Sequence, residues 1–76
     1  MNKITRIGLD IAKNIFVLHA VNEHGKTVKR QTLNRSKVLE CFANIEPCIV
    51  GIESCASSQH WAREIAKFGH TVKLMN

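Results

Sequence analysis

The stretch that decides the fold spans residues 4–21 and reads ITRIGLDIAKNIFVLHAV. Aliphatic residues alternate with small or polar ones over Ile4–Ile11, and this period of two predicts a strand with one apolar face. Lys13 and Asn14 can turn the chain. Ile15–Val21 is apolar on both faces, which is typical of a central strand that is covered on both sides. The stretch therefore predicts two strands joined by a short turn.

Further along, the chain becomes polar. Asn22–Gly25 has the length of a hairpin loop, with a glycine where a positive φ is expected. Lys26–Leu33 (KTVKRQTL) then reads as a strand whose Lys and Arg content suits the edge of a sheet. Asn34 or Ser36 can cap a helix that Pro47 limits. The apolar positions of this helix recur at helical spacing and are Val38, Leu39, Phe42 and Ala43.

The last third of the chain alternates strand and helix. Cys48–Ile52 (CIVGI) is a short continuous apolar run of the kind found in buried parallel strands. Ser57 or Ser58 can cap a second helix, and Gly69 is a suitable stop for it. Thr71–Met75 (TVKLM) reads as a further strand. The expected buried stripe of the second helix is Trp61, Ile65 and Phe68.

The element order is therefore strand, strand, strand, helix, strand, helix, strand. This order predicts an α/β fold with a mixed sheet, in which three antiparallel strands are followed by two helix-linked parallel strands. The first strand then lies beside the fourth and parallel to it, and ligands are expected near the carboxyl ends of both. With 76 residues the chain is one small domain or a piece of one, and its core is marginal. The chain stops after the fifth strand, which leaves one face of that strand and part of the core uncovered, so we expect self-association or partial disorder.

Composition and charge limit the classes of function that the chain can have. The chain is 45% hydrophobic and 22% charged, which excludes a disordered protein. No segment reads as transmembrane or secretory, and three cysteines are an odd number, so we expect no membrane partner and reduced thiols in a cytoplasm. The formal net charge of +5 favours polyanions, of which nucleic acid is the commonest.

The basic residues are concentrated in one run. Positions 26–37 contain five of the eleven Lys and Arg residues and no acid. Such a run is a candidate contact for nucleic-acid phosphates. It is equally compatible with a solvated face or with an edge strand that lysines protect from aggregation. The five candidates are Lys26, Lys29, Arg30, Arg35 and Lys37.

Two acids are placed where a metal could bind. Asp10 is the only aspartate and stands late on the first strand, between Gly8 and Ala12, which leave space around its carboxylate. Glu53 stands at the carboxyl end of the fourth strand. If these strands are neighbours, both carboxylates reach one divalent cation, and their oxygens suit Mg²⁺ or Mn²⁺, ions that assist phosphodiester displacement. Two structural roles stay open: Asp10 can support the turn at residues 12–14, and Glu53 can lie near the positive end of the second helix.

Other side chains are weaker candidates. Cys55 lies five residues before His60, which allows a thiol nucleophile with a His base, but a reactive Cys needs an electropositive, exposed setting, so no nucleophilic cysteine is predicted. His19 is expected to be a hydrogen-bonded core residue, and His70 to lie in a turn beside glycine. The spacing of Trp61 favours the helix core over stacking on a base. No Cys or His pair has the short spacing of zinc ligands.

Three sequence blocks stand out by their order and spacing. They are IGLDIAKN with Asp10, VGIESCAS with Glu53, and HWAREIAKFGH with its Trp61-Ala62-Arg63 core. Together they resemble the amino-terminal part of the DEDD-type insertion-sequence transposases of the insertion sequence 110 family, which is related to the Piv-type DNA invertases. The resemblance covers essentially the whole chain.

The resemblance implies a ribonuclease-H-like fold close to the RuvC-type junction resolvases, with residues 1–76 as the amino-terminal part of the catalytic domain. Asp10 and Glu53 match the first two acids of the family's four-carboxylate set, which holds Mg²⁺ for DNA strand cleavage and transfer. The family's other two aspartates follow the fifth strand. This chain has no second aspartate, so we expect the 76 residues alone to be inactive. The resemblance also implies a bacterial or archaeal cytoplasm, with DNA and an element-encoded guide RNA as partners.

Two other function classes remain open from the residues themselves. A sugar-kinase or actin-like ATPase also begins with a hairpin that carries an early Asp. It needs a glycine and a hydroxyl residue after that Asp, however, and Ile11, Ala12 and Lys13 stand there instead. A non-catalytic nucleic-acid-binding module would keep the basic run and would need neither Asp10 nor Glu53.

Overall fold

The computed structural model describes residues 4–12, 14–53 and 56–75. Its elements follow the predicted order, with a short 3-10 helix, η1, leading into the first α-helix. Along the chain they are β1 (Ile4–Ile11), β2 (Ile15–Asn22), β3 (Thr27–Asn34), η1 (Arg35–Lys37), α1 (Val38–Ala43), β4 (Ile49–Glu53), α2 (Ser58–Ala66) and β5 (Thr71–Met75). Across the described ranges, no helix has the length and apolar character needed to span a membrane.

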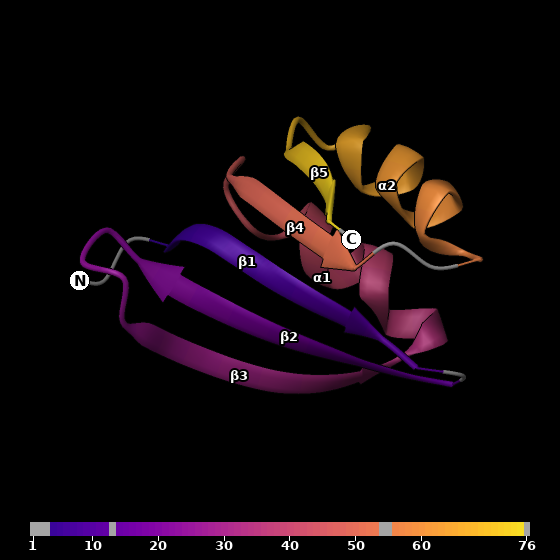
Figure 1. Ribbon diagram of the computed structural model, residues 1–76, viewed down its shortest axis with the longest axis horizontal. Helices are drawn as coiled ribbons and strands as arrows, with labels where there is room; N and C mark the ends of the chain where they lie inside the picture. Colours follow the sequence, from indigo (N-terminus) through magenta and orange to yellow (C-terminus); the bar gives the residue numbers. More distant parts are fainter. Residues whose placement is uncertain (1–3, 13, 54–55, 76) are drawn as a thin grey trace.

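The strands form one five-stranded mixed sheet in the order β3-β2-β1-β4-β5 (Figure 1). β1 pairs antiparallel with β2, and β2 pairs antiparallel with β3, as short hairpin turns dictate. β1 pairs in parallel with β4, and β4 with β5, because a helix links each of these strands to the preceding one. The predicted α/β class is confirmed, and so is the prediction that the first and fourth strands are neighbours.

Two glycines end elements where a positive φ is needed. Gly25 has a φ of 78° in the β2–β3 turn, and Gly69 has a φ of 93° after α2, and both match the sequence prediction. The β2–β3 turn is also held by Asn22, whose Oδ1 accepts hydrogen bonds from the backbone N–H groups of His24 and Lys26. This side chain is buried, so the turn is fixed from inside the protein.

The hydrophobic core lies between the sheet and the two described α-helices. Strands present every second residue to the helices, and α2 contributes Trp61 and Ile65 from its apolar stripe. Trp61 is 4% exposed and meets Phe16 edge to face at 4.8 Å, so the prediction of a core tryptophan is confirmed. Phe68 was expected in the same stripe, but it lies beyond the end of α2 at Ala66 and is 39% exposed.

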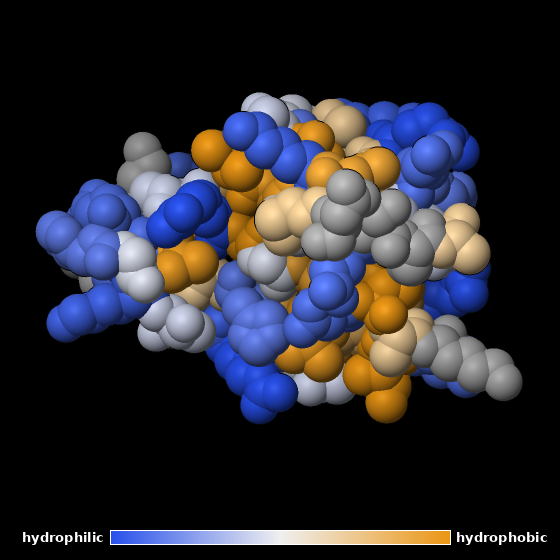
Figure 2. All heavy atoms as spheres, viewed as in Figure 1, coloured by the Kyte–Doolittle hydropathy of each residue, from blue (hydrophilic) through white to orange (hydrophobic). Residues whose placement is uncertain are grey.

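The opposite face of the sheet is the open face, and no described helix covers it. It carries Ile15, Ile49 and Met75, which are 50%, 40% and 50% exposed. In the view of Figure 1, α1 lies behind the sheet, and Figure 2 shows apolar side chains between polar ones on the side facing the viewer. The expectation that β2 is covered on both sides is therefore wrong, because α1 and α2 pack into one core on one side of the sheet.

We expect the chain to self-associate through this open face, since exposed apolar side chains favour association. Light scattering after size exclusion should give a mass above 8.6 kDa that rises with concentration. Ile49→Lys, which replaces an exposed apolar side chain at the start of β4 with a charge, should shift the chain towards the monomer. A monodisperse monomer at all concentrations would contradict the expectation.

Candidate functional site

Asp10 and Glu53 stand side by side at the carboxyl ends of β1 and β4. The parallel pairing of these strands runs up to Leu9 beside Ile52, so the next residue of each strand is an acid. Leu9 and Ile52 are buried against the helices. Because successive side chains alternate between faces, both carboxyl groups belong to the open face, and both residues are exposed. The structure thus brings the two predicted acids together.

Glycines lie next to both acids on the open face. Gly8 and Gly51 are paired across β1 and β4, two residues before Asp10 and Glu53. A Cβ at Gly8 would meet nothing within 4 Å, so the predicted space beside Asp10 is present. A Cβ at Gly51 would meet Cε of Met75 at 2.9 Å, so the Met75 side chain from β5 occupies the space beside Glu53.

His19 is the contact of Asp10 that the sequence did not predict. It pairs with Gly8 across β1 and β2, and its Nε2 lies 3.3 Å from Oδ2 of Asp10. Gly8 offers no side chain, so the imidazole can lean diagonally to the carboxylate. The expectation of a core histidine is wrong: the His19 side chain is 37% exposed and lies on the open face. The register of the β1–β2 hairpin is the signal that would have found this pair.

The alternative role of Asp10 is to support the β1–β2 turn. Among the described residues, no hydrogen bond or ion pair joins the Asp10 side chain to that turn. A backbone hydrogen bond closes that turn, from the N–H of Ala12 to the carbonyl of Ile15 at 2.9 Å. The described contact of Asp10 is His19. The carboxylate is therefore held above the sheet with one oxygen near the imidazole.

A pair of carboxylates fits a magnesium-type ion only in part. Mg²⁺ is usually held by one or two carboxylates together with waters and substrate phosphates, which matches Asp10 and Glu53. Within residues 4–12, 14–53 and 56–75, no group of three or more His, Cys, Asp and Glu side chains is arranged to hold a metal ion. The two carboxylates could therefore supply two ligands to such an ion, and the described residues offer no third side chain beside them for it.

The basic run does not gather on one surface. Lys29 and Arg30 are neighbours on β3 and therefore point to opposite faces, with Arg30 on the open face beside His19. The Arg35 guanidinium lies 5.7 Å from the ring centroid of Trp61, and the Lys37 ammonium lies 3.5 Å from Glu40. Lys26 lies at the end of the β2–β3 turn. The five cations can contact nucleic acid only from several sides of the protein.

The described cysteines are poor nucleophiles. Burial raises the pKa of both the Cys41 thiol and the Cys48 thiol, which disfavours the reactive thiolate. The alternative thiol, Cys55, lies outside the described residues. Its suggested base, His60, packs edge to face against Trp61 with the ring centroids 5.3 Å apart.

His70 is a buried residue that the sequence placed in a turn. Its Nδ1 accepts a hydrogen bond from the Cys48 N–H at 3.1 Å, and its Nε2 lies 2.9 Å from the carbonyl oxygen of Phe42. Since Nδ1 is an acceptor, Nε2 must carry the proton and donate it to Phe42. The ring therefore ties the end of α1 to the start of β4, and its role is structural.

Curated relatives of the chain carry transposase names. It is 44% identical over 72 residues, 95% of its length, to a probable family 20 transposase of Pseudomonas aeruginosa. It is 41% identical over all 76 residues to a transposase for insertion sequence element IS1328 of Yersinia enterocolitica, and 40% identical over 75 residues to a putative transposase of Sinorhizobium fredii. The chain spans only 19–23% of the length of these relatives. No family model matches it.

Proposed function

We propose that residues 1–76 are the amino-terminal part of the catalytic domain of a DEDD-type transposase of the insertion sequence 110 family, with a ribonuclease-H-like, RuvC-like fold. The proposal rests first on the placement of Asp10 beside Glu53 at the carboxyl ends of two neighbouring parallel strands. The mixed sheet order and the transposase names of relatives along the whole chain support it. The expected partners are DNA, an element-encoded guide RNA and further copies of the protein in the cytoplasm.

In this proposal Asp10 and Glu53 hold Mg²⁺ or Mn²⁺. A bound divalent ion supplies charge stabilisation for the attacking and leaving oxygens of phosphodiester displacement. His19 orients the Asp10 carboxylate through its 3.3 Å contact. Arg30 is paired with His19 on the open face and is placed to contact a DNA phosphate. The 76 residues alone should not cleave DNA, because two carboxylates are half of the implied set.

Metal binding by this chain tests the proposal directly. Mn²⁺ should broaden the backbone amide signals around Asp10 and Glu53 in NMR spectra, ahead of signals elsewhere in the protein. Asp10→Asn, which keeps the side-chain shape and removes the charge, should weaken Mn²⁺ binding about tenfold or more. Glu23→Gln is the matched control, because Glu23 is an exposed acid in the β2–β3 turn and lies away from the pair.

Two results would count against the assignment. One is uniform broadening, which would show that Mn²⁺ meets acids over the whole surface. The other is an equal loss of binding in Asp10→Asn and Glu23→Gln. Either result would mean that Asp10 and Glu53, the acid pair, give no reason to assign metal-dependent cleavage.

A further inference from the structure

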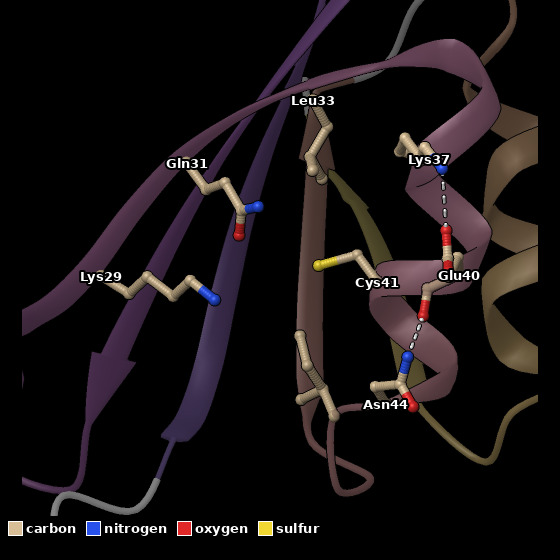
Figure 3. A pocket seen from close by; sticks show the side chains of 8 residues that line it. Lys29, Gln31, Leu33, Lys37, Glu40, Cys41 and Asn44 are labelled. Carbon is tan, nitrogen blue, oxygen red and sulfur yellow. Dashed lines mark hydrogen bonds and ion pairs between the residues drawn. The ribbon is translucent and has the colours of Figure 1, made fainter.

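A cavity of about 380 Å³ lies between β3 and α1, on the helix side of the sheet and away from the acid pair. Pockets of small-molecule sites start at about 300 Å³, so the cavity is large enough for a small ligand. Figure 3 shows it with strand residues on one side and helix residues on the other. Its walls include Lys29, Gln31 and Leu33 from β3, and Cys41 and Ile45 from α1 and the loop that follows it.

The alternation of side chains along β3 determines which polar groups face this cavity. Lys29, Gln31 and Leu33 are every second residue of the strand, so they share the face that looks towards α1. In Figure 3 the side chains of Lys29 and Gln31 extend towards Cys41. Lys29 is exposed and Gln31 is half-buried, and neither belongs to the hydrophobic core.

Gln31 carries an acceptor without a partner. Its Oε1 is buried and makes no hydrogen bond within the residues that the structure describes. A buried acceptor left unpaired costs about 1–3 kcal/mol. A ligand that donates a hydrogen bond to this oxygen would recover that cost.

Lys29 adds a positive charge at the same place. None of the ion pairs among the described residues involves Lys29, whereas Lys37 at the rim is paired with Glu40 at 3.5 Å. The Lys29 charge also opposes the effect of burial on the pKa of the Cys41 thiol, and both residues line the cavity. The cavity thus offers a cation, a free acceptor and the apolar walls of Leu33 and Ile45.

We propose that this cavity binds one nucleotide, with its phosphate on Lys29, a hydroxyl or amino donor on Oε1 of Gln31, and its sugar or base between Leu33 and Ile45. A nucleotide combines an anion, hydrogen-bond donors and an apolar ring surface within the size of the cavity. The nucleotide can be free or part of a single strand. The site is separate from the acid pair, so it does not depend on metal-dependent cleavage.

The test uses the 76-residue chain, with adenosine monophosphate in calorimetry and a labelled single-stranded oligonucleotide, as DNA and as RNA, in fluorescence anisotropy. Lys29→Gln should weaken binding about tenfold and reduce the salt dependence by about one charge. Gln31→Leu, which keeps a similar size and removes the acceptor Oε1, should weaken binding by a similar factor. Bound nucleotide should also slow alkylation of Cys41 and leave Cys48 unchanged.

Lys73→Gln is the matched control, because it removes the same charge from an exposed lysine of β5, which lies at the opposite edge of the sheet from β3. It should leave adenosine monophosphate binding unchanged. Tighter binding of the strand than of the free nucleotide, with the same variant pattern, supports the site and identifies the strand as its source. The proposal is overturned if neither probe binds at millimolar concentration, or if Lys73→Gln and Lys29→Gln weaken binding equally.

Discussion

Replacing Asp10 by Asn or Glu53 by Gln is expected to lower transposition roughly 10³-fold or more, because each change removes a charged ligand on which the proposed chemistry depends. Both residues are exposed at strand ends, so neither change should unfold the domain. A suitable test is a chimera in which these 76 residues replace the matching segment of the Yersinia enterocolitica relative, which is 41% identical over all 76 positions.

The control for this experiment is the chimera with Glu23→Gln, which removes an exposed acid of the β2–β3 turn. It should transpose like the unsubstituted chimera, and all variants should show the same thermal unfolding. Retained transposition in either Asp10→Asn or Glu53→Gln would refute the assignment of that acid. Retention in both would favour a nucleic-acid-binding module without catalysis.

Replacing His70 by Phe is expected to lower the free energy of unfolding by about 1–3 kcal/mol. The aromatic ring is kept next to Phe42, which it already meets edge to face at 5.6 Å. The Cys48 N–H, however, loses the acceptor that His70 provides, while the Phe42 carbonyl keeps its hydrogen bond from the Ile45 N–H at 3.3 Å. A buried group left unpaired costs about 1–3 kcal/mol, and a chain of this size has only about 4–11 kcal/mol in total.

Urea denaturation followed by circular dichroism measures this loss. His24→Phe serves as the control, because His24 has a side chain 73% exposed and should change stability by less than about 0.5 kcal/mol. If His70→Phe and His24→Phe have equal stability, the buried histidine does not join α1 to β4 as described.

Local sequence patterns were enough to predict the elements and their order. The period of two over β1, the glycines at positions 25 and 69, and the apolar run before Glu53 each depend on backbone geometry that a few neighbouring residues set. The boundaries differ by about one residue: β4, expected at Cys48–Ile52, is Ile49–Glu53. The position of β4 beside β1 followed from the order of strands and helices. The same order placed Asp10 beside Glu53.

Contacts between distant residues were not predictable in the same way. The side chain that reaches Asp10 depends on the β1–β2 register, which places Gly8 opposite His19. The burial of His70 depends on the ends of α1 and β4 meeting around it, and a single histidine after a glycine carries no periodic signal.

The sequence by itself determined the strands, the helices and the carboxyl-end position of Asp10 and Glu53, because these follow from alternation, turn residues and chain order. Only the tertiary structure decided which face of the sheet is covered. β2 is apolar on both faces, and its pattern is the same whether helices pack on one side or on two. It likewise decided that Lys29 and Gln31 face a cavity under α1 while Arg30 faces the open side, since that depends on which side of β3 the helix crosses.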